Sequence, residues 1–232
     1  MQGKNSIKAI IWDLDGTLIY FNIDFVRARR EAIKILKKNG VPKPYLSVEF
    51  SILDNVAKAR EFFTTQGLSE QKVAKIIKEV DTIITKVEYE AAQKAQMVHG
   101  IDQVLEYAKA KKLKQAIFTF NTNNNAEISL KTVNLRHFFK IIVGRDNVNN
   151  LKPHPEHLIY ICNQLKVTPG EVLVIGDSSR DIEAAINVGA YSIALDTKKP
   201  NFFGGEFINK ADVIIEHNEI PSKIIEAIEK LL

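Results

Sequence analysis

The sequence predicts an α/β fold in which a doubly wound parallel sheet carries an inserted all-helical domain. Acids and a glycine directly follow the apolar run 9–12, as they do where a buried strand ends. Residues 25–96 show a helical spacing of apolar groups without a strand pattern, and the rest of the chain alternates helical and strand patterns. Such alternation favours a parallel sheet with helices on both faces. We therefore assign residues 1–19 and 97–232 to the core domain and residues 20–96 to the helical domain.

The composition is that of an ordinary globular protein, with 45% hydrophobic and 26% charged residues in a chain of 232, long enough to bury a full core. No apolar run approaches the ~20 residues that a membrane-spanning helix needs, and the start, Met1–Ser6, is too polar for a signal peptide. We therefore expect a cytoplasmic protein without a membrane partner. The single cysteine, Cys162, lies in an apolar helical pattern, which indicates a buried thiol rather than a nucleophile.

The charge pattern argues against a nucleic-acid partner. The formal net charge is +4, from 32 basic and 28 acidic residues, and the lysines are spread along the predicted helices. Their densest group falls where a helix ends, a position at which cations suit the helix dipole: Lys109, Lys111, Lys112 and Lys114. No aromatic stripe is interleaved with the basic residues, as a nucleic-acid site requires. Nothing in the pattern specifies an oligomeric state.

Three helices account for the inserted block. The first runs from Phe25 to Asn39, and Gly40 ends it. The second is expected over 46–66. The third begins after Ser69, a suitable N-cap, and runs to about Gln96. Helices in series pack on one another, so we expect this block to form a separate small domain.

The core alternates helices and strands after the block. Pro155 suits the first turn of its helix and Gly189 suits a helix end. Besides the first strand we expect strands at 115–118, 140–143, 171–175, 191–195 and 211–215, and helices at 101–112, through 128–133, at 155–165, at 182–188 and at the C-terminus.

Two carboxylates follow the first strand. Asp13 and Asp15 are two positions apart in an extended segment, so their side chains point the same way, and Gly16 lets the chain turn at once. Two acids held this close need a cation or a shared proton. By itself the pattern is equally consistent with an acidic turn, so the decision rests on partners elsewhere in the chain.

Such partners follow the other strands. Thr119 ends the second strand, Lys152 lies in the loop after the third, and Asp177 and Asp181 follow the fourth. In a parallel sheet these strand ends lie at one edge, where they surround one crevice. Oxygen donors with few histidines suit Mg²⁺. A metal ion together with Lys152 and the Thr119 hydroxyl suits a dianionic phosphoryl group.

These segments together resemble the haloacid dehalogenase (HAD) superfamily, whose core is Rossmann-like, and within it the phosphatases with a helical cap, such as phosphoglycolate phosphatases. The resemblance covers about 7–195 and implies that the helical block is the cap. Each motif alone would be weak, but all four occur in order. They are Asp13-Leu14-Asp15-Gly16-Thr17, Thr119 after an apolar strand, Lys152 in Lys-Pro-His-Pro, and Gly176-Asp177-Ser178-Ser179-Arg180-Asp181.

The resemblance implies a mechanism for the acids. Asp13 would attack the phosphoryl group and become a transient aspartyl phosphate. Asp15 would protonate the leaving alcohol and then activate water. The family implies Mg²⁺ held by the Asp13 carboxylate, the Asp15 main-chain carbonyl and Asp177. Asp181 would not bind the ion directly but would lie next to these ligands or bind the ion through water. Asp181 has a simpler alternative role as the cap of the following helix.

The resemblance also assigns the phosphate-binding groups. Thr119 and Lys152 would bind the transferring group, and Lys152 would offset the charge of the nucleophile. The sequence departs from the usual pattern here, because Phe120 follows where many relatives have a small or polar residue and Asn121 comes one place later. Thr122 is therefore an alternative for the phosphate hydroxyl, but the apolar strand before Thr119 favours Thr119.

Other polar residues receive no catalytic role. The histidines show no metal-ligand spacing, and His154 and His157 are expected to face solvent near a helix start. The arginines at the start of the first cap helix are expected on a solvated face. These residues are His99, His137, His154, His157 and His217, and Arg27, Arg29 and Arg30.

The leading interpretation is a magnesium-dependent phosphatase that acts on a small phosphorylated metabolite. A phosphomutase of the same superfamily is the first alternative, and an inactive binding or regulatory protein is the second. Dehalogenation is disfavoured because Asp15 supplies an acid and base that dehalogenation does not need. Phosphoglycolate is only a family-based guess at the substrate. We expect the cap, with Asn22 or Arg27 near its first connection, to select the leaving group.

Overall fold

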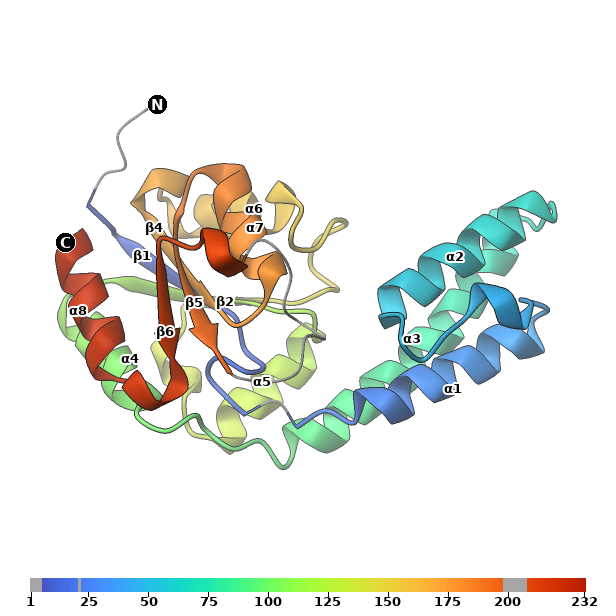
Figure 1. Ribbon diagram of the computed structural model, residues 1–232, viewed down its shortest axis with the longest axis horizontal. Helices are drawn as coiled ribbons and strands as arrows, with labels where there is room; N and C mark the ends of the chain where they lie inside the picture. Colours follow the sequence, from blue (N-terminus) through green and yellow to red (C-terminus); the bar gives the residue numbers. More distant parts are fainter. Residues whose placement is uncertain (1–5, 21, 198–207) are drawn as a thin grey trace. The chain divides into compact units, whose positions relative to one another are not determined.

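The computed structural model describes residues 6–20, 22–197 and 208–232. The polar start of the chain therefore lies outside the described residues, except for Ser6. The chain divides into two compact units (Figure 1). One is Asn22–Gln93, and the other consists of the described residues before and after it.

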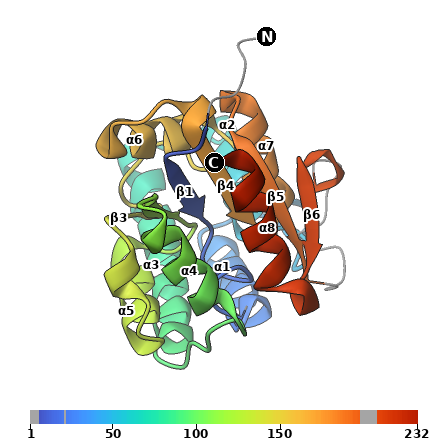
Figure 2. The same cartoon turned by 90° about the vertical axis from the view of Figure 1, so that its left-hand side faces the viewer.

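The core unit is built on a parallel sheet, which confirms the predicted fold class. The strand order is β3-β2-β1-β4-β5-β6, so β1 lies inside the sheet with β2 and β4 beside it. Figure 2 shows β4 next to β1, with β5 and β6 beyond it. Each described strand lies within two residues of its predicted position. The strands are β1 (Ala9–Trp12), β2 (Lys114–Phe118), β3 (Ile141–Val143), β4 (Val172–Gly176), β5 (Tyr191–Asp196) and β6 (Val213–Glu216).

Helices cover both faces of this sheet. Alternate residues of β1 enter two separate apolar clusters, because successive side chains of a strand point to opposite faces. Ile10 and Trp12 pack in the larger cluster and Ile11 in the smaller one. The first cluster includes residues of α4 (Ile101–Ala110), α5 (Asn123–Thr132) and α8 (Ser222–Leu231), and the second includes residues of α6 (Pro155–Leu165) and α7 (Ser179–Val188).

The register of the central strands aligns their carboxyl ends. Trp12 pairs with Ile117 of β2 and with Ile175 of β4. The main-chain N–H of Asp13 continues this ladder by donating to the Ile175 carbonyl at 2.9 Å. The polar residues that follow the three strands are thereby brought to one edge of the sheet.

The chain leaves and re-enters the core unit through two adjacent segments. The Tyr20 N–H donates to the Gln96 carbonyl at 2.8 Å, and the Val98 N–H donates to the Leu18 carbonyl at 3.0 Å. These two hydrogen bonds hold the base of the insertion together.

The helical unit has its own apolar core. Its helices are α1 (Phe25–Lys38), α2 (Ile52–Thr65) and α3 (Glu70–Ala92). Leu36, Phe63 and Ile76 are buried in one cluster, one residue from each helix. Ser69 caps α3 as predicted, since its hydroxyl accepts from the Lys72 N–H. The helix ends at Ala92, earlier than the predicted end near Gln96.

The prediction for the second helix was wrong at its start. Helix α2 begins at Ile52 rather than at Leu46, and Ser51 is its N-cap. Leu46 is buried in the apolar core, which accounts for its place in the helical pattern. The buried Asn55 side chain donates to main-chain carbonyls within 47–51, at 2.8 to 3.2 Å, and so stabilises a non-helical turn there.

The remaining elements are short. Helix α4 ends at Ala110 rather than at Lys112, whose positive φ of 59° is incompatible with a continuing helix. Among the residues that the structure describes, no helix is both long and apolar enough to cross a bilayer. The 3₁₀ helices are Lys43–Tyr45, Arg136–Phe138, Pro169–Glu171, Ile208–Lys210 and His217–Glu219.

Candidate active site

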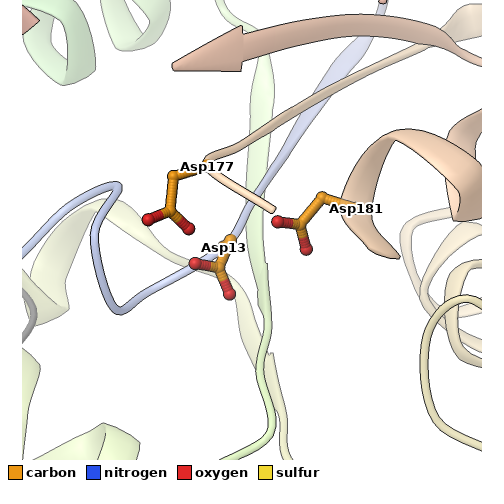
Figure 3. A group of neighbouring side chains, drawn as sticks. All are labelled: Asp13, Asp177 and Asp181. Carbon is orange, nitrogen blue, oxygen red and sulfur yellow. The ribbon is translucent and has the colours of Figure 1, made fainter. Parts of the chain in front are cut away.

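Three buried carboxylates meet at the carboxyl edge of the sheet. Asp13 follows β1, Asp177 follows β4, and Asp181 lies in the first turn of α7. One oxygen of each lies within 4.8 Å of the others. Figure 3 shows Asp13 between the side chains of Asp177 and Asp181. Residues separated by more than 160 positions thus form one acidic cluster.

Two glycines make room for the acidic cluster. Gly16 has a φ of +92°, and a Cβ there would lie 2.0 Å from an Asp177 carboxylate oxygen. A Cβ on Gly176 would lie 2.4 Å from the carboxyl carbon of Asp181. Any larger residue at either position would displace a carboxylate of the cluster.

The buried ammonium of Lys152 lies between two of these acids. Its Nζ hydrogen-bonds to the Asp13 carboxylate, lies 2.7 Å from Asp181 Oδ1, and donates to the Phe118 carbonyl at 3.1 Å. Burial disfavours the charged form, but the two carboxylates outweigh burial and raise the pKa of Lys152 above its usual value. Lys152 is therefore a fixed positive charge at the position predicted for a phosphate ligand.

The acidic cluster carries more negative than positive charge. Burial raises the pKa of Asp13 to about 6, because the pull of Lys152 in the opposite direction is smaller and Asp181 adds repulsion. Burial and the neighbouring Asp13 and Asp181 also raise the pKa of Asp177 well above its usual value. A divalent cation would relieve this repulsion, and hard carboxylate oxygens are the donors that Mg²⁺ prefers. The donor set therefore fits a magnesium ion.

Asp15 is held from one side by an amide. Its Oδ2 accepts a hydrogen bond from Asn121 Nδ2 at 2.7 Å. The Asn121 N–H in turn donates to Thr119 Oγ1 at 3.1 Å. In the sequence Asn121 was visible only as a departure from the family pattern, two residues after Thr119. The structure gives it a contact with the proposed general acid.

The two candidate hydroxyls have different surroundings. Thr119 is buried next to the strand end, and its N–H continues the sheet ladder to the Val143 carbonyl at 3.1 Å. The Thr122 hydroxyl instead caps α5, because it accepts from the Asn125 N–H at 3.3 Å. This difference favours Thr119 as the phosphate-binding hydroxyl.

Asp181 combines the two roles that the sequence left open. Its Oδ2 accepts from the Ser178 N–H at 2.9 Å and from the Ser178 hydroxyl at 2.6 Å, which caps α7. Its other oxygen, Oδ1, faces Lys152. The carboxylate that caps the helix therefore also holds the ammonium.

The expectation that His157 faces solvent was wrong. Its side chain is fully buried, whereas His154 is exposed as expected. His157, Ile161 and Leu165 recur every four residues along α6 and lie on its buried face. That spacing was the sequence signal for burial. A second histidine, His217, also reaches the site, with Nε2 3.0 Å from the Gly16 carbonyl, and no sequence pattern indicated this contact.

Of the three arginines expected on a solvated face of the helical unit, one is buried instead. Arg27 is exposed and pairs with Glu90 of the same unit at 2.6 Å. Arg29 is buried and donates to the Val48 carbonyl at 2.9 Å, so its prediction was wrong. Arg30 is exposed, as predicted.

Comparison with known proteins finds relatives that are named as pyrophosphatases or phosphatases. A pyrophosphatase PpaX of Bacillus anthracis is 27% identical over 215 residues, which cover 84% of this chain and 91% of the relative. An N-acetylmuramic acid 6-phosphate phosphatase of Pseudomonas putida is 24% identical over 229 residues, covering 95% and 97% of the two chains. Both relatives are named as enzymes that cleave phosphate bonds.

Solved structures share the fold. A β-phosphoglucomutase from Clostridium difficile superposes with a TM-score of 0.69 at 22% identity, covering 97% of each chain. A HAD phosphatase from Thermococcus onnurineus superposes with a TM-score of 0.60 at 23% identity, covering 94% of this chain and 98% of the other. The family model of haloacid dehalogenase-like hydrolases matches residues 10–195, which span β1 to β5 and all the acids described above. The chain therefore belongs to the haloacid dehalogenase-like hydrolase family.

Proposed function

We propose that this enzyme is a magnesium-dependent phosphatase that hydrolyses a small phosphorylated metabolite through an aspartyl phosphate on Asp13. The observation that carries the proposal is the buried cluster of three carboxylates, two of which contact Lys152, at the edge where Thr119 follows β2. A cluster of this kind offers a nucleophile, a metal site and a phosphate-binding cation within a few ångströms.

The chemistry runs in two displacements. An oxygen of Asp13 forms a bond to phosphorus while the bond from phosphorus to the ester oxygen breaks, and Asp15 gives that leaving oxygen a proton. Asp15 then takes a proton from water, whose oxygen attacks phosphorus and displaces the Asp13 carboxylate. The products are the alcohol and inorganic phosphate, and both acids return to their starting state. Asn121 orients Asp15 for both proton transfers, because its amide donates to one oxygen of the Asp15 carboxylate.

The metal site is assigned to three groups. The carboxylates of Asp13 and Asp177 and the main-chain carbonyl of Asp15 would hold Mg²⁺. When bound, the ion supplies positive charge next to the phosphoryl oxygens. Asp181 acts through Lys152, because both of its oxygens already have partners in Ser178 and the ammonium.

Hydrolysis of an aryl phosphate by the purified enzyme tests the proposal. We expect turnover with Mg²⁺, none in excess chelator, and restoration when Mg²⁺ is added back. Asp13→Asn should abolish turnover while leaving the circular dichroism spectrum unchanged. The control is Asp102→Asn, which changes a half-buried acid in the first turn of α4, outside the acidic cluster, and should remain active. Full activity of Asp13→Asn would refute the mechanism.

A phosphomutase would be recognised by its products. Incubation with a sugar phosphate should release inorganic phosphate in step with substrate loss if water accepts the phosphoryl group. An isomeric sugar phosphate with little free phosphate would instead identify a mutase.

A further inference from the structure

His157 is a buried polar group that the proposed mechanism does not use. Its ring forms two hydrogen bonds: Nδ1 accepts from the main-chain N–H of Lys152 at 3.3 Å, and Nε2 bonds to the Val143 carbonyl at 3.1 Å. The ring also makes an edge contact with Phe118, the residue whose carbonyl accepts from Lys152 Nζ. A buried imidazole with both nitrogens engaged is fixed in one orientation.

The two contacts define the protonation of the ring. An N–H group can donate only to an unprotonated nitrogen, so Nδ1 must be the acceptor for Lys152. The proton then lies on Nε2, which donates it to the Val143 carbonyl. Burial, together with Lys152, lowers the pKa of His157 to about 4, although the Val143 hydrogen bond, Asp181 and Glu156 act in the opposite direction. The ring is therefore neutral near pH 7.

His157 connects the two residues assigned to phosphate binding. The Val143 carbonyl accepts from the ring and also from the main-chain N–H of Thr119 at 3.1 Å. On its other side the ring holds the main chain of Lys152. One side chain thus reaches the backbone of Lys152 directly and that of Thr119 through a single shared carbonyl.

We propose that His157 is a positioning residue that holds Lys152 and Thr119 in place to bind the transferring phosphoryl group. The inference rests on the proposed function, and it concerns a residue outside the set that performs the chemistry. Small displacements of a charged group that contacts a transferring phosphoryl lower the rate, because the transition state needs that charge in place beforehand.

Two substitutions separate positioning from packing. His157→Leu fills a similar volume but forms neither hydrogen bond. In His157→Gln the amide offers one acceptor and one donor, so it can restore both. The matched control is Ile161→Val, a change one turn later on the same buried face of α6 that weakens packing without affecting a hydrogen bond.

The kinetic readouts are kcat with an aryl phosphate and the inhibition constant of inorganic phosphate, measured well below the melting temperature of each variant. We expect His157→Leu to lower kcat about tenfold and to weaken phosphate inhibition by a similar factor. His157→Gln should return both values to within about threefold of the wild type, and Ile161→Val should leave both unchanged. The proposal is overturned if His157→Leu behaves like Ile161→Val, or if His157→Gln shows no recovery.

A second arm does not depend on turnover. In spectra of ¹⁵N-labelled protein, His157 should show a proton on Nε2 and an unprotonated Nδ1. The Lys152 main-chain N–H should exchange slowly with solvent and should exchange at least tenfold faster in His157→Leu. If the wild type hydrolyses no phosphate ester, the proposed function fails, yet these spectra still decide whether His157 holds Lys152. The opposite tautomer, or unchanged exchange in the leucine variant, would refute the positioning role.

Discussion

Replacing Gly16 by alanine would test how closely the acidic cluster depends on a missing side chain. Two effects arise at this position. A φ of +92° disfavours a residue with a Cβ by about 1–2 kcal/mol. In addition, the new Cβ would lie 2.0 Å from Asp177, whereas separations under 3.0 Å essentially never occur, so the carboxylate must move by about 1 Å. A shift of about 1 Å in a group that holds the reacting centre can lower a rate about a hundredfold.

Gly40→Ala is the matched control. Its φ of +97° gives a similar backbone penalty, but no atom lies within 4 Å of the added Cβ. Both variants should therefore lose about 1–2 kcal/mol of stability. Only Gly16→Ala should need more Mg²⁺, because only there is a proposed ligand displaced.

The assay is a Mg²⁺ titration of aryl phosphate hydrolysis at fixed substrate, with thermal melts of both variants. We expect the half-saturating Mg²⁺ concentration of Gly16→Ala to rise about tenfold or more and kcat to fall, while Gly40→Ala follows the wild-type curve. If Gly16→Ala titrates like Gly40→Ala, Asp177 does not hold the metal in the way that we propose.

Three further outcomes are expected. Asn121→Leu removes the hydrogen bond to Asp15 and should slow alkyl phosphates about tenfold more than aryl phosphates, whose leaving groups need little protonation; equal losses would show that the contact does not serve the acid. The unfolded chain binds a proton at His157 below pH 6.5 while the native ring stays neutral to about pH 4, so the His157 contribution to stability falls by about 2.5 kcal/mol as the pH is lowered from 7 to 4.5. Asp13 and Asp177, whose raised pKa values act in the opposite direction, contribute equally in all variants, so the measure is a difference: urea unfolding at both pH values should show that the wild type and His137→Gln lose about 2.5 kcal/mol more than His157→Gln, and the same change in all three would exclude His157 as its source. Asn22→Ala should change relative kcat/KM among metabolites about tenfold and leave an aryl phosphate nearly unaffected, and a uniform change would remove this residue from substrate selection.

That Asp13 and Asp177 lie together was predictable because each directly follows an apolar strand. Strand ends of a parallel sheet share one edge, so Asp13 and Asp177 could be placed together without knowing any distance. The strand order did not need to be known for this step. What the sequence left open was the role of Asp181. A helix cap and a partner of Lys152 would both be an aspartate at this position, so the pattern could not distinguish the two roles.

The errors have a common physical origin in polar residues that act on the main chain. Asn55 donates hydrogen bonds to backbone carbonyls before the helix, so α2 does not extend back to Leu46 as the apolar pattern suggested. His157 looked like a surface residue because imidazole is polar, yet its partners are one N–H and one carbonyl of the backbone. Side-chain periodicity does not report such bonds, because their partners are groups that every residue carries.

The paired connections at the base of the insertion have a consequence for how such an enzyme can change. Because Tyr20 bonds to Gln96 and Val98 bonds to Leu18, the chain leaves and re-enters the sheet unit at a single place. The length of what lies between then has only a small effect on the entropy of closing that loop. Residues 22–93 can therefore be lengthened, shortened or exchanged as one block without shifting the register of β1, which allows the chemistry to be inherited separately from the helical unit.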